Sequence, residues 1–266
     1  RDRLPAAAEW PEIAPVFHYP DWLNAGVELC DRMVERGFGD RVALIGNGRQ
    51  RTYKELTDWS NRIAHALVDV YGVKPGNRVL IRSANNPAMV ACWLAATKAG
   101  AVVVNTMPML RAGELGQIVD KGEIAFALCD TRLMEELVIC AKHSKFLKTV
   151  VGFDGTANHD AELDRVALGK SVRFTAPPVG RDDVALIGFT SGSTGEPKGV
   201  PISRRNYDAL HGWYAALLAR LGKPSPFALA VLGGRLTATP GLAFFAGYQG
   251  ALRLLWPCTL AQSPTA

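Results

Sequence analysis

The sequence lacks any pattern of paired cysteines. Its 266 residues include five cysteines, an odd number that cannot all pair, and no two of them form a C-x-x-C motif. Most lie among apolar neighbours, which predicts buried, reduced thiols in a cytoplasmic protein rather than a disulfide framework. No signal peptide is recognisable, which agrees with that location. The cysteines are Cys30, Cys92, Cys129, Cys140 and Cys258.

The sequence also lacks histidines at metal-ligand spacing and dense clusters of basic residues. The five histidines lie far apart in the sequence, so we assign no metal ligands. Thirty basic and twenty-five acidic side chains leave a net charge of only +5. Because the basic residues are scattered, we expect no nucleic-acid partner and no binding to anionic membranes.

No stretch of the chain is long and apolar enough to predict a membrane span. The most apolar segment, residues 241–256, is short and is interrupted by Gln249 and Arg253. A hydrophobic content of 48% with 21% charged residues is ordinary for a soluble globular protein. The sequence gives no indication of the oligomeric state.

The segment 184–200, which reads VALIGFTSGSTGEPKGV, carries the strongest chemical signal. The apolar run 184–189 predicts a buried strand, and a loop rich in glycine and hydroxyl groups follows it. Glycines let backbone N–H groups approach an anion, hydroxyls donate to phosphate oxygens, and a lysine adds positive charge. We therefore predict a phosphate-binding loop, with a plain surface loop as the alternative. Its candidate ligands are Thr190, Ser191, Gly192, Ser193, Thr194, Gly195 and Lys198, and Gly199 follows them.

Two familiar loops do not fit this segment. A Walker loop requires Gly-Lys before Ser or Thr, whereas Lys198 follows Pro197; the other Gly-Lys-Ser, at 169–171, has Asp164 in place of the first glycine. A nucleophile elbow would match residues 188–192 as G-x-T-x-G, but the residues that follow do not begin a good helix. No catalytic residue is identifiable by these patterns.

The rest of the chain alternates helix and strand signals. A capping box at Thr52 and Glu55 predicts a helix with apolar residues at helical spacing up to Val70. Strands are predicted at 78–82, 101–105, 124–129 and 149–153, and helices at 88–98, 111–121 and 131–142. Residues 155–178 read as an irregular surface connection. This alternation predicts an α/β protein with helices packed on largely parallel β-sheets.

Residues 190–199, TSGSTGEPKG, resemble the signature loop of the adenylate-forming superfamily of acyl-CoA synthetases. The resemblance implies an ATP-dependent, AMP-forming carboxylate–CoA ligase that works through an acyl adenylate. It also implies a small-molecule carboxylic acid as substrate, ATP with Mg²⁺, and CoA as co-substrate. In that family the loop closes over the β- and γ-phosphates of ATP, so by resemblance Lys198 would steady the loop and its charge, and phosphate oxygens would be held by Thr190, Ser191, Ser193 and Thr194. The attacking carboxylate belongs to the substrate, so no protein nucleophile is required.

A narrower resemblance is to the benzoate and 2-aminobenzoate CoA ligases, which implies an aromatic acid. It rests on residues 19–24, 85–87, 91–94, 106–112 and 127–130. Trp93 and Met107 lie in these segments, and we expect both to pack in the core rather than against a ring of the substrate.

The resemblance extends over residues 20–200 and then fades. Arg204 stands where other family members have a histidine, residues 207–221 predict a helix, and we could not place the segment from Pro224 onward. We expect residues 1–266 to be a partial N-terminal AMP-binding domain, with an extended segment at 1–20, a diverged tail at 201–266 and no C-terminal domain. Such a fragment is expected to be inactive alone. The alternatives are an inactive remnant that at most binds nucleotide, and an adenylation domain of another adenylate-forming enzyme.

Overall fold

The computed structural model describes residues 20–156, 160–191 and 196–204, and the backbone of strands at 226–232, 235–237 and 253–257. For Ser191 only the backbone is described. The helices are α1 (Tyr53–His65), α2 (Pro87–Lys98), α3 (Ala112–Lys121), α4 (Met134–His143) and α5 (Glu162–Leu168), with short helical turns at Val27–Asp31, Val34–Phe38, Ala66–Val70 and Thr131–Leu133. The strands are β1 (Val42–Gly46), β2 (Arg49–Thr52), β3 (Arg78–Arg82), β4 (Val102–Thr106), β5 (Phe126–Asp130), β6 (Thr149–Phe153), β7 (Val184–Ser191), β8 (Pro197–Ser203), β9 (Pro226–Leu232), β10 (Arg235–Thr237) and β11 (Arg253–Pro257).

A six-stranded sheet forms the centre of the molecule, in the order β6-β5-β3-β4-β7-β8. The first five strands of this order are parallel, and only β8 runs antiparallel to its neighbour. Parallel strands need crossover connections, and α2, α3, α4 and α5 supply them. The predicted α/β class with a largely parallel sheet is therefore confirmed.

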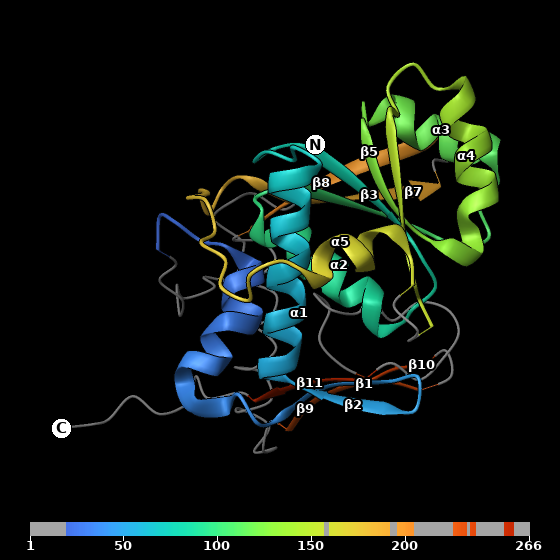
Figure 1. Ribbon diagram of the computed structural model, residues 1–266. Helices are drawn as coiled ribbons and strands as arrows, with labels where there is room; N and C mark the ends of the chain where they lie inside the picture. Colours follow the sequence, from blue (N-terminus) through green and yellow to red (C-terminus); the bar gives the residue numbers. More distant parts are fainter. Residues whose placement is uncertain are drawn as a thin grey trace, which may run out of the picture.

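Helices cover both faces of this sheet (Figure 1). Because side chains alternate along a strand, Val79 and Ile81 of β3 pack on one side with α1, α2 and α5, whereas Leu80 packs on the other with α3 and α4. Residues of β4 and β5 divide in the same way. The near-continuous apolar strands in the sequence follow from burial of both faces.

A second sheet of five strands has the order β10-β9-β11-β1-β2 and lies at the end of α1 where that helix begins (Figure 1). β1 and β2 form a hairpin that the sequence analysis did not predict, although the Asn47-Gly48 turn between them is a strong hairpin signal. β9 and β11 come from the region after Pro224 that could not be placed, and β11 pairs with β1.

Local signals fix the two longest helices. The Thr52 side chain accepts the Glu55 N–H, and the Glu55 carboxylate accepts the Thr52 N–H, so the predicted capping box is confirmed. The Asn86 side chain caps α2 by accepting the Met89 N–H, and Pro87 occupies the first turn. Every residue of α2 is buried, including Trp93, whose place in the core is as predicted.

Three expectations about the fold were wrong. Residues 155–178 are not irregular throughout, because they contain α5, whose seven residues are too few to show a clear helical period. β7 continues two residues beyond the predicted end at Phe189, since it pairs with β8 as far as Ser191. Met107 is 53% exposed rather than part of the core, because it lies in the loop after β4. The helix predicted at 207–221 falls outside the described residues.

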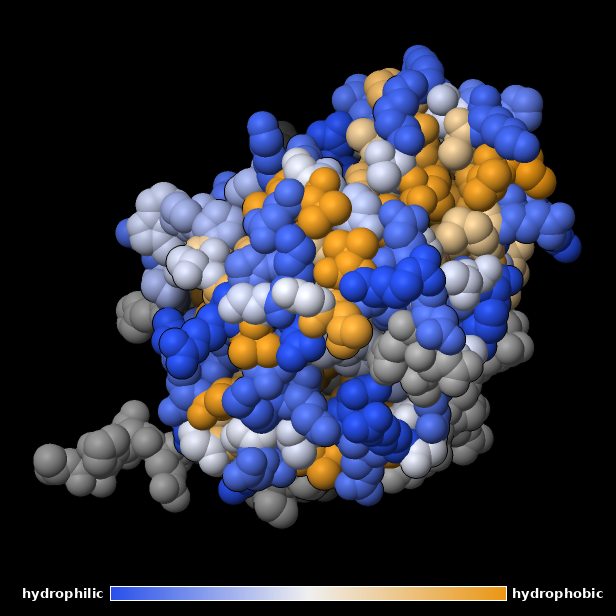
Figure 2. All heavy atoms as spheres, viewed as in Figure 1, coloured by the Kyte–Doolittle hydropathy of each residue, from blue (hydrophilic) through white to orange (hydrophobic). Residues whose placement is uncertain are grey.

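The surface shows apolar groups over α3, α4 and α5 (Figure 2). Exposed apolar side chains on these helices include Val138 and Ile139 on α4 and Leu168 on α5. A groove of about 530 Å³ runs between α3 and α4 and is lined in part by Gly113 and Gly116. A Cβ atom added at either glycine would meet no atom within 4 Å, so internal packing does not require glycine at these positions.

We expect the four described cysteines to react slowly with thiol reagents. Cys30, Cys92, Cys129 and Cys140 are free and buried. Burial is the largest cause that raises the pKa of each thiol, to about 12 for Cys129. A raised pKa lowers the reactive thiolate fraction at pH 8. Titration of a Cys258→Ser variant with Ellman's reagent should therefore show little reaction in buffer and four thiols in denaturant. Rapid reaction of all four in buffer would contradict their burial.

Candidate functional site

The β7–β8 hairpin carries the described part of the predicted phosphate site. Thr190 lies directly opposite Lys198, and Ser191 lies opposite Pro197. Residues directly opposite each other in an antiparallel pair present their side chains on the same face, and Thr190 and Lys198 are both exposed. A hydroxyl donor and an ammonium group are therefore adjacent at the end of the hairpin. Gly192, Ser193, Thr194 and Gly195 lie outside the described residues.

Gly199 has a structural explanation. It pairs with Phe189, and a Cβ atom at position 199 would lie 3.2 Å from Cγ2 of Ile187 and 3.3 Å from the Phe189 ring. These side chains pack against the sheet core on the side of α3 and α4. Packing therefore accounts for glycine at this position without a bound anion.

The hairpin adjoins the parallel part of the sheet. β7 lies beside β4, with Leu186 opposite Val103. In open α/β sheets, ligands bind in the crevice outside the carboxyl ends of the strands. Because β7 is parallel to β4, its end at Ser191 belongs to this edge. Glu196 at the hairpin end also lies 3.8 Å from Lys121 of α3, but both side chains are largely exposed and the pair adds little stability.

The Arg82 side chain holds the segments that follow β4 and β5 by hydrogen bonds to their backbone. This arginine is 2% exposed and donates hydrogen bonds of 2.8–3.2 Å to the carbonyl oxygens of Met107, Pro108, Leu110 and Leu133. Burial is the main cause that lowers its pKa. The five-donor geometry of guanidinium suits this arrangement, which a lysine could not reproduce. Arg82 thus holds the Met107–Leu110 loop in one conformation at the carboxyl edge. Sequence reasoning did not identify this role, because Arg82 reads as the last residue of a strand.

A second buried polar cluster lies at the ends of β3, β5 and β6. Asp130 is fully buried, and its carboxylate accepts hydrogen bonds from Arg132 Nη2 at 2.6 Å, Arg132 Nε at 2.9 Å and Asn86 Nδ2 at 3.1 Å. The hydrogen bond to Asp130 is the main cause that raises the pKa of Arg132. Because both carboxylate oxygens accept hydrogen bonds, Asp130 joins the segments that follow β3 and β5.

The described residues contain no group of three or more His, Cys, Asp or Glu side chains placed to hold a metal ion. They also contain no helix that is long and apolar enough to cross a membrane.

The exposed hydroxyl of Thr190 and the ammonium of Lys198 do fit the oxygens of a phosphate group, because both are donors on one face of the hairpin.

Comparison with curated proteins shows similarity to acid–CoA ligases of differing substrates. The chain is 31% identical over 167 residues to a medium/long-chain-fatty-acid–CoA/3-oxocholest-4-en-26-oate–CoA ligase of Mycolicibacterium smegmatis, covering 60% of this chain and 30% of that protein. It is 28% identical over 178 residues to a 3-hydroxybenzoate–CoA ligase of Aromatoleum sp., covering 67% of this chain and 34% of the relative. The chain thus spans about a third of the length of these relatives.

Among solved structures, the fold is similar to that of the anthranilate CoA ligase AuaEII in complex with anthranoyl-AMP. The TM-score is 0.67 at 19% sequence identity, and the match covers 74% of this chain and 37% of that one. This likeness shows the fold alone. Residues 32–231, which include the β7–β8 hairpin, match the AMP-binding enzyme family. The chain therefore belongs to the AMP-binding enzyme family, and the relatives similar to it include acyl-CoA ligases.

Proposed function

We propose that the chain is the N-terminal part of an ATP-dependent, AMP-forming carboxylate–CoA ligase that works through an acyl adenylate. The observation that carries this proposal is the pairing of Thr190 with Lys198 on an exposed hairpin, inside the region that matches the AMP-binding family. The substrates would be a small carboxylic acid, ATP with Mg²⁺, and CoA. A cytoplasmic location belongs to the same proposal and is supported by the four buried, free thiols.

In this function, the chain's own residues bind and orient the phosphates. Thr190 would donate its hydroxyl to a phosphate oxygen, and Lys198 would place its positive charge beside the same group. Ser191, Ser193 and Thr194 would add hydroxyl donors, while Gly192 and Gly195 would let backbone N–H groups approach. The substrate carboxylate takes the adenylyl group of ATP to give the acyl adenylate, and pyrophosphate leaves. Holding the phosphates in line provides rate through positioning and charge stabilisation.

For the acid we propose an aromatic carboxylate such as benzoate or 2-aminobenzoate. The similarity to a 3-hydroxybenzoate–CoA ligase supports this preference. The relative from Mycolicibacterium smegmatis acts on fatty acids and a steroid acid, so family membership alone gives only the broader class of carboxylic acids.

Replacing Lys198 by alanine is expected to weaken the binding of magnesium ATP about tenfold or more, because a hydrogen bond to a charged group is worth roughly 1.5–3 kcal/mol. A Thr190→Ala/Ser191→Ala double variant should have a similar effect. Isothermal titration calorimetry of the wild type and the variants measures the change.

The matched control is Lys74→Ala, which removes the same charge from an exposed loop before β3. Its affinity should equal that of the wild type. Equal affinities for Lys198→Ala and Lys74→Ala would contradict the phosphate assignment. Absence of any nucleotide binding by the wild-type chain would favour the alternative of an inactive remnant.

A further inference from the structure

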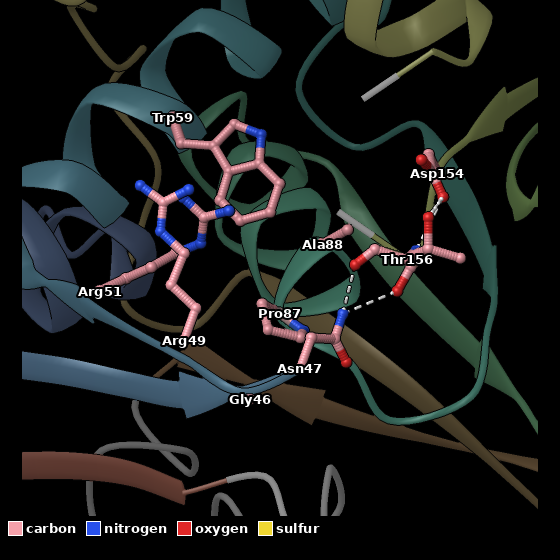
Figure 3. A pocket seen from close by; sticks show the side chains of 10 residues that line it. Gly46, Asn47, Arg49, Arg51, Trp59, Pro87, Ala88, Asp154 and Thr156 are labelled. Carbon is pink, nitrogen blue, oxygen red and sulfur yellow. Dashed lines mark hydrogen bonds between the residues drawn. The ribbon is translucent and has the colours of Figure 1, made fainter. Parts of the chain in front are cut away.

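The hollow between the β1–β2 hairpin, α1 and the segment after β6 is too small for a ligand (Figure 3). It leaves only about 10 Å³ for the centre of a water-sized molecule, which is about the space that one water needs. Its charged groups also have partners, since Arg49 lies 3.9 Å from Glu55 and the Arg51 guanidinium stacks over the Trp59 ring. A more open surface lies at the turn after β4.

The residues after β4 form a tight turn that exposes two methionines. The Leu110 N–H donates to the Met107 carbonyl oxygen at 3.3 Å across the turn, and Pro108 occupies the second position, where proline is favoured. Met107 and Met109 are 53% and 52% exposed, whereas Leu110 packs against the core under α3 and α4. The turn therefore presents two apolar side chains to solvent.

Arg82 keeps this turn in a fixed position. Its guanidinium donates to the carbonyl oxygens of Met107, Pro108 and Leu110 at 2.8–3.2 Å. The methionines are thus exposed on an anchored turn and not on a loosely held loop. An anchored contact surface loses little conformational freedom when a ligand binds.

Met107 lies next to the proposed phosphate pair. In the parallel strands β4 and β7, Val103 is opposite Leu186. Met107 and Thr190 each follow four residues later, so the register places Met107 beside Thr190. Neighbouring strands are about 4.8 Å apart, which is within reach of a methionine side chain. An exposed apolar surface therefore adjoins the hydroxyl of Thr190 and the ammonium of Lys198.

We propose that Met107 and Met109 contact the ring of the aromatic acid and help to select it, an inference that rests on the proposed function. The acid must lie beside the phosphates of ATP to attack, and the turn supplies an apolar surface there. A methionine sulfur makes favourable contacts with the edge of an aromatic ring at about 5 Å, and its flexible side chain adapts to substituents. The pair should therefore favour 2-aminobenzoate over a saturated ring of similar size.

The test is an NMR titration of the chain labelled with ¹³C in its methionine methyl groups. 2-Aminobenzoate is added in the presence of magnesium and α,β-methylene-ATP, which cannot release pyrophosphate. Saturable shifts of the Met107 and Met109 signals are expected, because an aromatic ring shifts the signals of nearby methyl groups. The other three methionines are the internal controls, since Met33 and Met89 are buried and Met134 is partly buried. Cyclohexanecarboxylate should bind more weakly.

Met107→Gln and Met109→Gln should each weaken 2-aminobenzoate binding about threefold to tenfold, as for loss of one sulfur–aromatic contact. The matched control is Leu168→Gln, which removes an apolar side chain that is 73% exposed on α5. This control should bind the acid like the wild type. Chemical denaturation of each variant verifies that it is folded.

Unchanged Met107 and Met109 signals, equal affinities for the three variants, or equal affinities for the two acids would overturn the proposal. Nucleotide binding separates this result from failure of the proposed function. If the ATP analogue binds in a manner that requires Lys198 but the acid leaves the methionine signals unchanged, Met107 and Met109 do not select the acid. If the analogue does not bind, the proposed function is contradicted, and the role of the two methionines with it.

Discussion

A Gly155→Ala variant is expected to lose about 3–5 kcal/mol of unfolding free energy, because the new methyl group would enter a buried charged cluster. Its Cβ atom would lie 2.6 Å from Arg132 Nη2 and 2.7 Å from Asn86 Nδ2, and closer still to Asp130 Oδ2. These groups are bonded to one another, and Asp130 is fully buried, so none can move without leaving a polar group unsatisfied. Urea unfolding followed by circular dichroism measures the loss.

Gly116→Ala is the control for this substitution. Gly116 lies within α3 and faces open space, so alanine there should raise stability by roughly 0.5–1 kcal/mol through helix propensity. If Gly155→Ala proved as stable as Gly116→Ala, the described packing at the ends of β3, β5 and β6 would be incorrect.

Removing the carboxylate of Asp31 is expected to destabilise the chain by about 3 kcal/mol or more. Its partner Lys98, at the end of α2, has a side chain only 1% exposed, with Nζ 2.6 Å from Asp31 Oδ2. The remaining contacts of Nζ are neutral, to Asn61 Oδ1 at 2.7 Å and Ser60 Oγ at 2.9 Å. An Asp31→Ala variant therefore leaves a buried ammonium group without a counter-charge. The same urea unfolding experiment measures the effect.

Asp58→Ala is the comparison for Asp31→Ala. Asp58 pairs with Lys54 at 2.5 Å on α1, but the lysine side chain is 52% exposed and the carboxylate 30% exposed. Exposed pairs of this kind contribute about 0–1 kcal/mol. Similar losses for both variants would show that solvent reaches Lys98 and that the pair is not buried.

Local patterns were sufficient to predict most of the central sheet and its helices. The Thr52 capping box and the Asn86-Pro87 start depend on residues three or four apart, so they can be recognised without knowledge of the fold. Apolar strands bounded by turn residues can also be recognised without knowledge of the fold. Where the local signal was weak, as in the short helix α5, the element was missed. The β1–β2 hairpin had a usable signal in Asn47-Gly48 that was not recognised.

Short stretches of sequence predicted the alternation of strands and helices, the family resemblance of the 190–199 loop, and the candidate phosphate ligands within it. Which distant residues meet depends on the three-dimensional fold. The fold places Asp31 against Lys98, although the two residues are 67 positions apart in the sequence. It also surrounds Arg82 with four carbonyl oxygens from two segments of the chain. It also brought Arg51, Trp59 and Thr156 to one hollow. Charges and polar groups acquire such partners only when packing of the helices and strands brings distant segments together, and no local periodicity encodes that arrangement.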